Sequence, residues 1–446
     1  MNNVATGDFE RLLSGTQLKS NYTSDEFLQD SSRIIAFYLP QYHEVPENSE
    51  WWGKGFTDGV NVAKARPLFD GHYQPHIPRD LGFYDASLES TLSAQVDLAK
   101  EYGLYGFCFY WYWFDGKRML SKPIDTFSKS NLNFPFCFCW ANESWARTWD
   151  GNPKEILIEQ VYSIGWQKKL IQDLAKYWLD ERYIKVDNRP LLLIYRAKII
   201  PDYFESIKKL REAAMELLGV NPYIVIVDFY DVSSASEFGA DALVEFPPHK
   251  FWHESNHVDA PNEQIMDFEG RIIDYKKVVV QSISRQISTK EIIFRTLMPS
   301  WDNTARIGTR AVIIQNTNPQ LFKVWLDALR QFTRENRQPN ANFLFVNAWN
   351  EWAEGAHLEP DLYTEMGFLN QIKKSMFFQK DCSYLSMEYV RESLGIAEDK
   401  IDRNPYFSPK YYSPADTIKM RLASKIHFIS PSLYRLLRRL YRSTLG

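Results

Sequence analysis

Two glutamates near the carboxyl end of the chain have the types and spacing needed for acid–base chemistry. Glu351 and Glu354 stand three residues apart in "NAWNEWAEGAHLEPD", among tryptophans and just before a glycine. If this segment turns helically, the two side chains face the same side. Neighbouring carboxyl groups in an apolar setting acquire different pKa values, so that one donates a proton and the other accepts one. Making or breaking a glycosidic bond needs such a pair.

The same pattern also fits a purely structural role. In that interpretation Asn350 caps a helix, and Glu351 and Glu354 favour its positive end. The choice between the two depends on which other side chains gather near the glutamates, and therefore on the elements that position them.

Short apolar runs bounded by polar, proline or glycine residues predict eight buried strands. They occupy residues 33–40, 105–114, 134–141, 189–196, 221–230, 240–247, 291–299 and 341–349. Helical spacing of apolar residues recurs between many of them, at 86–103, 164–181, 202–219 and 318–336. This alternation predicts an α/β fold, a parallel (β/α)8 barrel of the TIM type, with long βα loops at 41–86 and 246–273.

Active sites of such barrels lie where the strands run out into the following loops. Several predicted strands end in polar and aromatic residues, in segments such as "WANESWARTWDG" and "MPSWDNTAR". Besides the two glutamates, the side chains expected to bind substrate at this mouth are Tyr38, Tyr42, His43, Trp52, His76, Tyr110, Tyr112, Trp140, Asn142, Glu143, Arg147, Trp301, Asp302, Asn303, Arg306, Trp349, Asn350 and Trp352. This convergence favours the catalytic interpretation.

Composition narrows the class of ligand. Aromatic residues make up 15% of the 446 residues, with 14 Trp and 25 Tyr, and such rings suit stacking against the apolar faces of sugars. The formal net charge of -4 makes nucleic acid an unexpected partner. The four cysteines form no metal or disulfide framework and are expected to be reduced.

A metal site is the rival hypothesis for one histidine-rich segment. His249, His253 and His257 recur every fourth residue in "PPHKFWHESNH", as metal ligands on one helical face do. The preceding Pro-Pro and the lack of an HExxH glutamate argue against it. We therefore expect no metal and no cofactor, and a polar loop over the cleft instead.

Outside the barrel, residues 1–30 are expected to form an N-terminal arm and residues 376–446 a helical extension, with the barrel at 31–375. Arg435, Arg438, Arg439 and Arg442 form one stripe of a basic amphipathic helix at about 430–442, opposite a stripe of leucines. Such a helix either binds an anionic membrane surface or packs on the barrel with its arginines in solvent. The sequence shows no signal peptide and no membrane-spanning run, so the expected location is cytoplasmic, peripheral to the inner face of the cytoplasmic membrane.

Seven motifs in order resemble the WbsX-type glycosyltransferase family. They are "FYLPQYH", "WWGKGFT", "LFDGHYQPHIPRDLGFYD", "GFCFYWYWFDGKRML", "PFCFCWANESWARTWDG", "MPSWDNTAR" and "NAWNEWAEGAHLEPD", and they cover about residues 33–370. This family is associated with bacterial lipopolysaccharide O-antigen synthesis and is similar to glycoside hydrolase family 99, the endo-α-mannosidases, whose fold is a (β/α)8 barrel.

The resemblance implies roles for individual residues. Glu351 draws the proton from the substrate's 2-hydroxyl, which attacks the anomeric carbon, and Glu354 handles the proton of the leaving group. Tyr42 matches a tyrosine near the reacting sugar, and Glu143 matches a substrate-binding carboxylate. One departure bears on specificity: the family usually continues "GFT" with Glu-Trp, where this chain has Asp58 and Gly59.

The sequence therefore predicts an enzyme that makes or remodels glycosidic bonds in a bacterial surface polysaccharide. Its expected partners are a glycan or lipid-linked oligosaccharide and a sugar donor. An endo-acting retaining hydrolase and a glycan-binding barrel without activity remain alternatives.

Overall fold

The computed structural model describes residues 27–29, 32–146, 156–252, 256–259, 265, 267–285, 287, 291–336, 338 and 340–379. The predicted helix at 430–442 and most of the two expected terminal segments lie outside these residues. From those segments the structure describes β1 (Phe27–Gln29) and β20 (Phe377–Gln379), which pair antiparallel. Among the described residues, no helix combines the length and the apolar character that crossing a bilayer requires.

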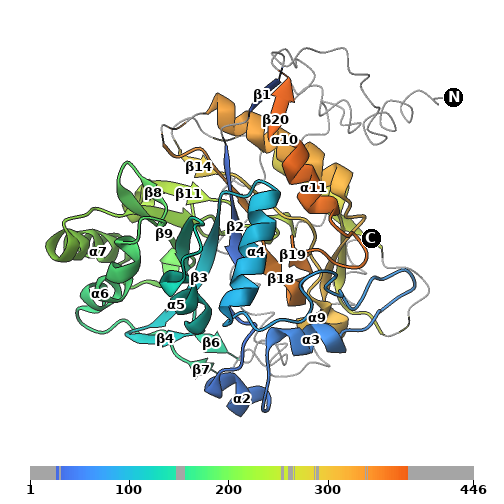
Figure 1. The fold of residues 1–446 in the computed structure, drawn as a ribbon, viewed down its shortest axis with the longest axis horizontal. Coiled ribbons are helices and arrows are strands. Elements are labelled where there is room, and N and C mark those ends of the chain that lie inside the picture. Colours follow the sequence, from blue (N-terminus) through green and yellow to red (C-terminus); the bar gives the residue numbers. More distant parts are fainter. Residues whose placement is uncertain are drawn as a thin grey trace, which may run out of the picture. The chain divides into compact units, whose positions relative to one another are not determined.

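A parallel barrel occupies the centre of the described residues, with helices α4, α6, α7 and α10 outside it (Figure 1). Its strands are β2 (Arg33–Tyr38), β3 (Gly106–Phe114), β5 (Phe136–Trp140), β9 (Arg189–Ile194), β10 (Tyr223–Val227), β11 (Ala242–Val244), β14 (Ile293–Phe294), β15 (Thr296–Leu297) and β17 (Phe343–Val346). They pair in this order, and β17 returns to β2 with Phe345 opposite Ile35. Because β14 and β15 flank one residue, they are two halves of the seventh strand, and the (β/α)8 prediction is confirmed.

The strands form where the sequence is continuously apolar, because both of their faces are covered. All five residues of β10, "YIVIV", are buried between the barrel interior and the outer helices. The helices are amphipathic instead. On α4 (Glu89–Glu101) the buried positions are Leu92, Gln95, Val96 and Ala99, which recur at helical spacing and face the barrel.

The outer helices follow the strands in the order that a (β/α)8 barrel requires. They are α4 after β2, α5 (Lys122–Lys129) after β3, α6 (Trp166–Trp178) after β5, α7 (Tyr203–Leu218) after β9, α8 (Tyr275–Ser284) after β11, α10 (Pro319–Glu335) after β15 and α11 (Gly367–Lys374) after β17. After β10 the chain has only the short 3-10 helix η4 (Ser236–Phe238). Helix α10 begins at Pro319, and the side chain of Asn318 caps it by accepting from the Leu321 N–H at 2.9 Å.

Shorter elements in the long loops surround the mouth of the barrel. The connection at 41–86 contains α2 (Pro46–Trp52) and α3 (Asp58–Lys64), which the apolar pattern did not predict. A separate three-stranded sheet is formed by β12 (His257–Val258), β13 (Arg271–Asp274) and β16 (Val312–Gln315). Small antiparallel additions are β4 (Lys117–Met119) on β3, β8 (Lys185–Val186) on β9, and the pair β6 (Trp145–Ala146) with β7 (Ile156–Ile158).

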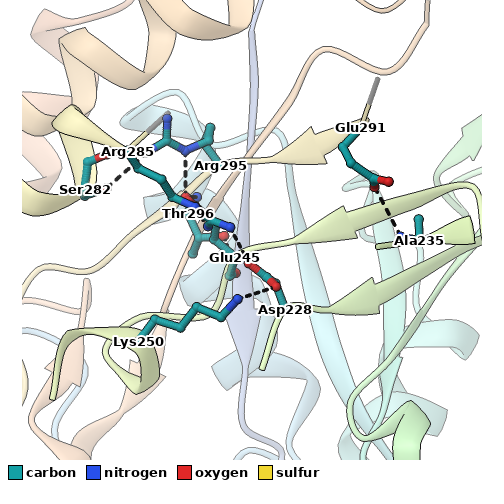
Figure 2. Close-up of polar contacts among 9 residues, drawn as sticks. All are labelled: Asp228, Ala235, Glu245, Lys250, Ser282, Arg285, Glu291, Arg295 and Thr296. Atoms are coloured by element: carbon teal, nitrogen blue, oxygen red, sulfur yellow. Dashed lines mark hydrogen bonds and ion pairs between the residues drawn. The ribbon is translucent and has the colours of Figure 1, made fainter. Parts of the chain in front are cut away.

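A buried network of charges holds the seventh strand to its neighbours (Figure 2). Arg295, the residue between β14 and β15, donates to Glu245 at 2.8 Å. Arg285 donates to Glu245 at 2.6 Å and to Asp228 at 2.8 Å, and Lys250 pairs with Asp228 at 2.5 Å. A charge is tolerated inside a protein only where partners replace its hydration, so these contacts allow an arginine to interrupt a barrel strand.

Candidate active site

The two glutamates lie on a tight hairpin that follows β17. Strands β18 (Asn350–Glu351) and β19 (Ala356–His357) pair antiparallel, and the 3-10 turn η8 (Trp352–Glu354) joins them. Gly355 closes the turn with φ at 61°, and a Cβ at this position would lie 2.8 Å from the backbone nitrogen of Asp302. Only glycine meets both conditions without strain.

The end of β2 fixes this hairpin in place. The side chain of Asn350 is fully buried; it accepts from the Leu39 N–H at 2.8 Å and donates to the Leu39 carbonyl at 3.0 Å. The Tyr42 hydroxyl donates to the Asn350 carbonyl at 2.7 Å and accepts from the Trp352 N–H at 3.1 Å. The first strand therefore positions the residues on either side of Glu351.

One guanidinium group brings three carboxylates together. Arg306, on the short helix α9 (Thr304–Ile307), donates from Nη2 to Glu351 at 3.1 Å and to Asp58 at 2.7 Å. Its Nη1 donates to Glu354 at 2.5 Å. Asp58 has no exposed surface, so the loop at 41–86 contributes a buried acid to the same cluster.

Burial and mutual repulsion leave this cluster holding a proton near neutral pH. Burial first, and then the neighbouring Glu354 and Asp58, raise the pKa of Glu351 to about 8, against the opposing charge of Arg306. Burial also raises the pKa of Glu354, again against Arg306. The three carboxylates in turn raise the pKa of Arg306 above its ordinary value, so the guanidinium stays charged. Because the two glutamates interact, their titration belongs to the pair.

Both glutamates line a cavity of about 390 Å³ at the carboxyl ends of the barrel strands. Its other lining residues are Gln41, Tyr110, Tyr112, Phe114, Ala141, Glu143, Ser144, Trp145, Ala146, Tyr195, Phe246, His249, Trp252, Trp301, Asn303, Arg306 and Ile307. Tyr112 stacks on Trp145 with centroids 5.5 Å apart, and Trp252 meets Trp301 edge-on at 5.9 Å. An aromatic wall with a few convergent polar groups is typical of small-ligand sites.

A further carboxylate, that of Glu143, lines the same cavity. Glu143 follows β5 and accepts from Arg196 at 2.8 Å, and Arg196 also lies 3.7 Å from Asp231. Burial raises the pKa of Glu143, and Arg196 opposes that rise. The cavity thus offers two carboxylate–arginine groups, one around Arg306 and one around Arg196.

The structure brings together some of the predicted site residues and separates others. Those that line the cavity are Tyr110, Tyr112, Glu143, Trp301, Asn303, Arg306, Glu351 and Glu354. Those that are buried and do not line it are Tyr38, Tyr42, His43, His76, Trp140, Asn142, Asp302, Trp349, Asn350 and Trp352. Trp52 is half-buried on α2, against Phe56, and does not line the cavity either. Arg147 lies outside the described residues.

Two of the buried residues, Asn142 and Asp302, make contacts that hold the loops and strand ends around the cavity. Asn142 accepts from the Arg196 N–H at 2.8 Å and so fixes the end of β9 beside β5. Asp302 accepts from the Gln74 amide at 2.8 Å and lies 2.6 Å from the ring of His72, and these contacts tie the loop at 41–86 to the seventh strand. These polar side chains are of types common in active sites, but the hydrogen bonds described here are to other parts of the protein.

Some cavity residues were missed by the sequence analysis, although their positions carried a signal. Tyr195 directly follows the fourth strand, and Trp145 lies in the segment after the third. Asp58 was noted only as a departure from the family pattern. Gly59 beside it lines a second, mostly apolar cavity of about 350 Å³, together with Phe83, Tyr84 and Trp352.

The histidines do not form the metal-ligand helix that their spacing suggested. His249 lies on η5 (His249–Phe251) and lines the cavity, His257 lies on β12, and His253 is outside the described residues. A different group is compact: His76, His357 and Asp361 are all buried, with three side-chain atoms within 4.8 Å of one another. His76 Nδ1 lies 2.8 Å from His357 Nε2, the separation of a direct hydrogen bond. We interpret these contacts as structural: they join the loop at 41–86, which carries His76, to the segment that carries His357 and Asp361.

Comparison with known proteins identifies the family. The family described as Glycosyltransferase WbsX matches residues 34–372. The chain belongs to the WbsX glycosyltransferase family. The family resemblance is thereby confirmed, and membership places the chain among the carbohydrate-active enzymes.

Two curated relatives share 37% identity with this WbsX chain over 345 residues, 77% of its length. Both are called "Uncharacterized protein WxcX" and come from two strains of Xanthomonas campestris pv. campestris. The matched region is 49% of each relative, so the chain spans about half the length of the curated relatives it matches.

Solved structures are similar in fold. A "Glycoside hydrolase-like protein" superposes with a TM-score of 0.51 at 13% identity, over 81% of the WbsX chain and 98% of the other. A GH99 endo-α-mannosidase from Bacteroides thetaiotaomicron gives a TM-score of 0.46, also at 13% identity, with the same coverage. At such identity the first comparison supports the barrel fold and nothing finer.

Proposed function

We propose that the chain is a glycosyltransferase of surface polysaccharide synthesis, in which Glu351 and Glu354 carry out the proton transfers at the glycosidic bond. The observation that carries this proposal is the cluster in which one guanidinium, Arg306, holds both glutamates at the lining of a cavity rich in aromatic residues. A pair splayed apart or facing bulk solvent would not support this chemistry.

The proposed reaction follows the roles implied by the family resemblance. Glu351 takes the proton of the donor's 2-hydroxyl, and the freed oxygen attacks the anomeric carbon from within the sugar. Glu354 gives its proton to the departing oxygen. In the second half, the acceptor oxygen bonds to the anomeric carbon, the bond from that carbon to the 2-oxygen breaks, the acceptor's proton passes to Glu354, and Glu351 returns its proton to the 2-oxygen. The stereochemistry at the anomeric carbon is retained.

The electrostatics of the free site are compatible with these roles. A base works best when the pKa of its conjugate acid lies near the working pH, and Glu351 has a pKa of about 8. For catalysis the shared proton must sit on Glu354 when the donor binds. The closeness of both groups to Arg306 makes that transfer a small change within one hydrogen-bonded cluster.

The proposed partners are a glycan or lipid-linked oligosaccharide as acceptor and a sugar donor, both bound in the 390 Å³ cavity. We also propose a cytoplasmic location at the membrane surface through the predicted helix at 430–442. The WbsX family and its association with O-antigen synthesis support the substrate class, and the basic stripe of that helix supports the location.

The test is mass spectrometry of surface glycan and its lipid-linked precursor from cells that lack this protein. A product short by one sugar supports transfer, and an overlong product indicates cleavage, as an endo-acting hydrolase would give. An unchanged glycan contradicts both. Complementation with Glu351→Gln or Glu354→Gln should fail, whereas the exposed Glu216→Gln should restore the glycan. If the two site variants restore it fully, the barrel binds glycan without catalysis.

A further inference from the structure

A third glutamate is buried directly behind the hairpin. Glu359 lies two residues after β19 and is 1% exposed, and it does not line the cavity with Glu351 and Glu354. Neither of the proposed proton-transfer steps uses it. Burying an unpaired charge costs free energy, so the surroundings of this carboxylate must compensate for its lost hydration.

Three neutral donors surround this carboxylate. The Tyr84 hydroxyl donates to Oε2 at 2.9 Å, and the indole N–H of Trp352 donates to the same oxygen at 2.6 Å. The amide of Gln95, on α4, donates to Oε1 at 2.6 Å, while its own oxygen accepts from Tyr38 at 2.8 Å. Among the described residues, no lysine or arginine forms an ion pair with Glu359. The group therefore joins the loop at 41–86, helix α4 and the hairpin through hydrogen bonds alone.

Trp352 connects Glu359 to the proposed catalytic pair, because it is the residue between Glu351 and Glu354 that begins the 3-10 turn. Its backbone N–H is held by Tyr42, and its ring stacks on His357 with centroids 3.7 Å apart. The remaining freedom of the side chain is the direction of its indole N–H, and Glu359 fixes that direction.

We propose that Glu359 is a positioning residue whose ionised carboxylate holds the Trp352 indole, and through it the turn that presents Glu351 and Glu354. This inference deepens the proposed function and rests on it for its catalytic consequence. The structural part, the bond between carboxylate and indole, is independent of any activity.

The bond depends on the protonation of Glu359. An ionised carboxylate accepts from all three donors, whereas a protonated one carries a hydrogen that neither the indole nor the Gln95 amide nitrogen can accept. Protonation therefore opposes this arrangement of donors. Burial raises the pKa of Glu359 to about 7, and hydrogen bonding from Trp352, Gln95, Tyr84 and Trp349 opposes that rise. Burial outweighs them because no cation contributes.

The tyrosines and the histidine packed around Glu359 keep the same charge near pH 7, while Glu359 gains or loses its proton. Burial raises the pKa values of Tyr38 and Tyr84 well above the ordinary phenol value, so both stay neutral. Burial lowers the pKa of His357 to about 4, so its ring is uncharged near neutrality. On the hairpin itself, burial raises the pKa of Glu351 to about 8, and the Glu359→Gln variant separates its titration from that of Glu359. A transition at Trp352 that is absent in Glu359→Gln is therefore assigned to Glu359.

Nuclear magnetic resonance of protein labelled with ¹⁵N-tryptophan tests the bond directly. The indole signal of Trp352, assigned with Trp352→Phe, should move with a midpoint near pH 7 in the wild type and lose this transition in Glu359→Gln. The indole signal of Trp113, which donates to Asp173 at 2.6 Å, should be the same in both proteins. A Trp352 signal with the same position and the same pH dependence in the wild type and in Glu359→Gln overturns the proposal.

Kinetics on the glycan substrate test the positioning role. Because small misplacements of reacting groups cost rate, Glu359→Gln should lower kcat about tenfold or more with KM nearly unchanged, and should remove the limb of the pH profile near 7. Trp352→Phe should act similarly, and the double variant should be little worse than either single one. Additive losses, or a wild-type pH profile in Glu359→Gln, contradict positioning. If no turnover is found for any protein, the proposed function fails while the resonance test still stands.

Discussion

At the scale of single residues, environment sets what each carboxyl group of the site does. Asp58 and Glu354 each meet a separate nitrogen of Arg306 at 2.5 to 2.7 Å, whereas Glu351 shares Nη2 with Asp58 at a longer 3.1 Å. Glu351 is also 5% exposed and lies beside both other acids. Burial and the two neighbouring acids therefore make the ionised form of Glu351 costly.

This difference predicts how Glu351→Gln changes stability with pH. The pKa of Glu351 is about 8 in the folded protein, above its ordinary value of 4.5, so its stabilising contribution is fully present below 4.5 and is lost as pH rises through 8. A neutral glutamine does not lose it. The melting temperature of Glu351→Gln should therefore rise relative to wild type between pH 5 and 9. Glu216→Gln is the exposed control, and a constant difference across this range would refute the assigned cause.

Arg306 should matter more for stability than any exposed arginine. In Arg306→Gln the buried acids lose their cation, and removing one partner of a buried ion pair costs roughly 3–5 kcal/mol. Without the cation the folded pKa of Glu354, which burial already raises, rises further, so the loss should grow as pH increases. Urea unfolding at pH 5 and pH 8 measures it. Arg79→Gln breaks an exposed pair with Asp80, and should cost at most about 1 kcal/mol at both values.

Three of the four charged residues of this cluster could be predicted from the sequence, because barrel topology brings the ends of strands together. Glu351, Glu354 and Arg306 directly follow the eighth and seventh strands, and barrel topology brings such positions together. Asp58 lies 248 residues before Arg306, on a loop whose path no periodicity indicates. Tyr42 and Asn350 were predicted near the site because they follow the first and eighth strands. Their hydrogen bonds show that they hold the hairpin. Residue types alone do not separate these two functions.

At the scale of elements, two glycines of the site region should respond in opposite ways to alanine. Gly59 lies in α3, and a Cβ there would make ordinary contacts of 3.4 Å with Thr57 and 3.5 Å with Phe83. Gly59→Ala should stabilise the protein by about 0.5–1 kcal/mol, because glycine costs backbone entropy in a helix.

Gly355→Ala should be destabilising, because φ is 61° and the new Cβ would approach the Asp302 nitrogen to 2.8 Å. Thermal unfolding of the two variants under the same conditions measures both effects. If Gly59→Ala destabilises as much as Gly355→Ala, the helical geometry of α3 described above is wrong.

The elements themselves were largely predictable. Each of the eight apolar runs contains a barrel strand, and the four helical patterns correspond to α4, α6, α7 and α10. The run at 291–299 forms β14 and β15, which are separated at Arg295, whose charge is compensated only in the folded network of Figure 2. Helices α2 and α3 were missed because each has 7 residues, too few to show a helical period.

At the scale of the whole molecule, the barrel explains why distant motifs form one cavity. Parallel strands all end on the same side, so polar residues placed after them converge regardless of their separation in sequence. The barrel does not determine what the cavity binds, because one fold supports many activities. In this chain the loops at 41–86 and 246–252 supply Asp58, His249 and Trp252, and specificity is therefore expected to depend on these loops.

The predicted helix at 430–442, outside the described residues, is expected to bind an anionic membrane surface. From Thr417 onward the chain has seven Lys or Arg and no acidic residue, so an amphipathic helix there should be drawn to anionic lipid. Deleting Ser430 to Gly446 should move the protein from the membrane to the soluble fraction, and reduce its co-sedimentation with vesicles that contain phosphatidylglycerol.

The matched variant replaces Arg435, Arg438, Arg439 and Arg442 with Gln and keeps the leucine stripe. It should lose binding to anionic vesicles at low salt while its melting temperature stays that of the full chain, because the arginines are expected to face lipid headgroups and not the barrel. If the deletion instead lowers the melting temperature by several degrees and leaves partitioning unchanged, the helix packs on the barrel. Because electrostatic attraction is screened by salt whereas apolar packing is not, repeating both measurements at high salt separates the two roles.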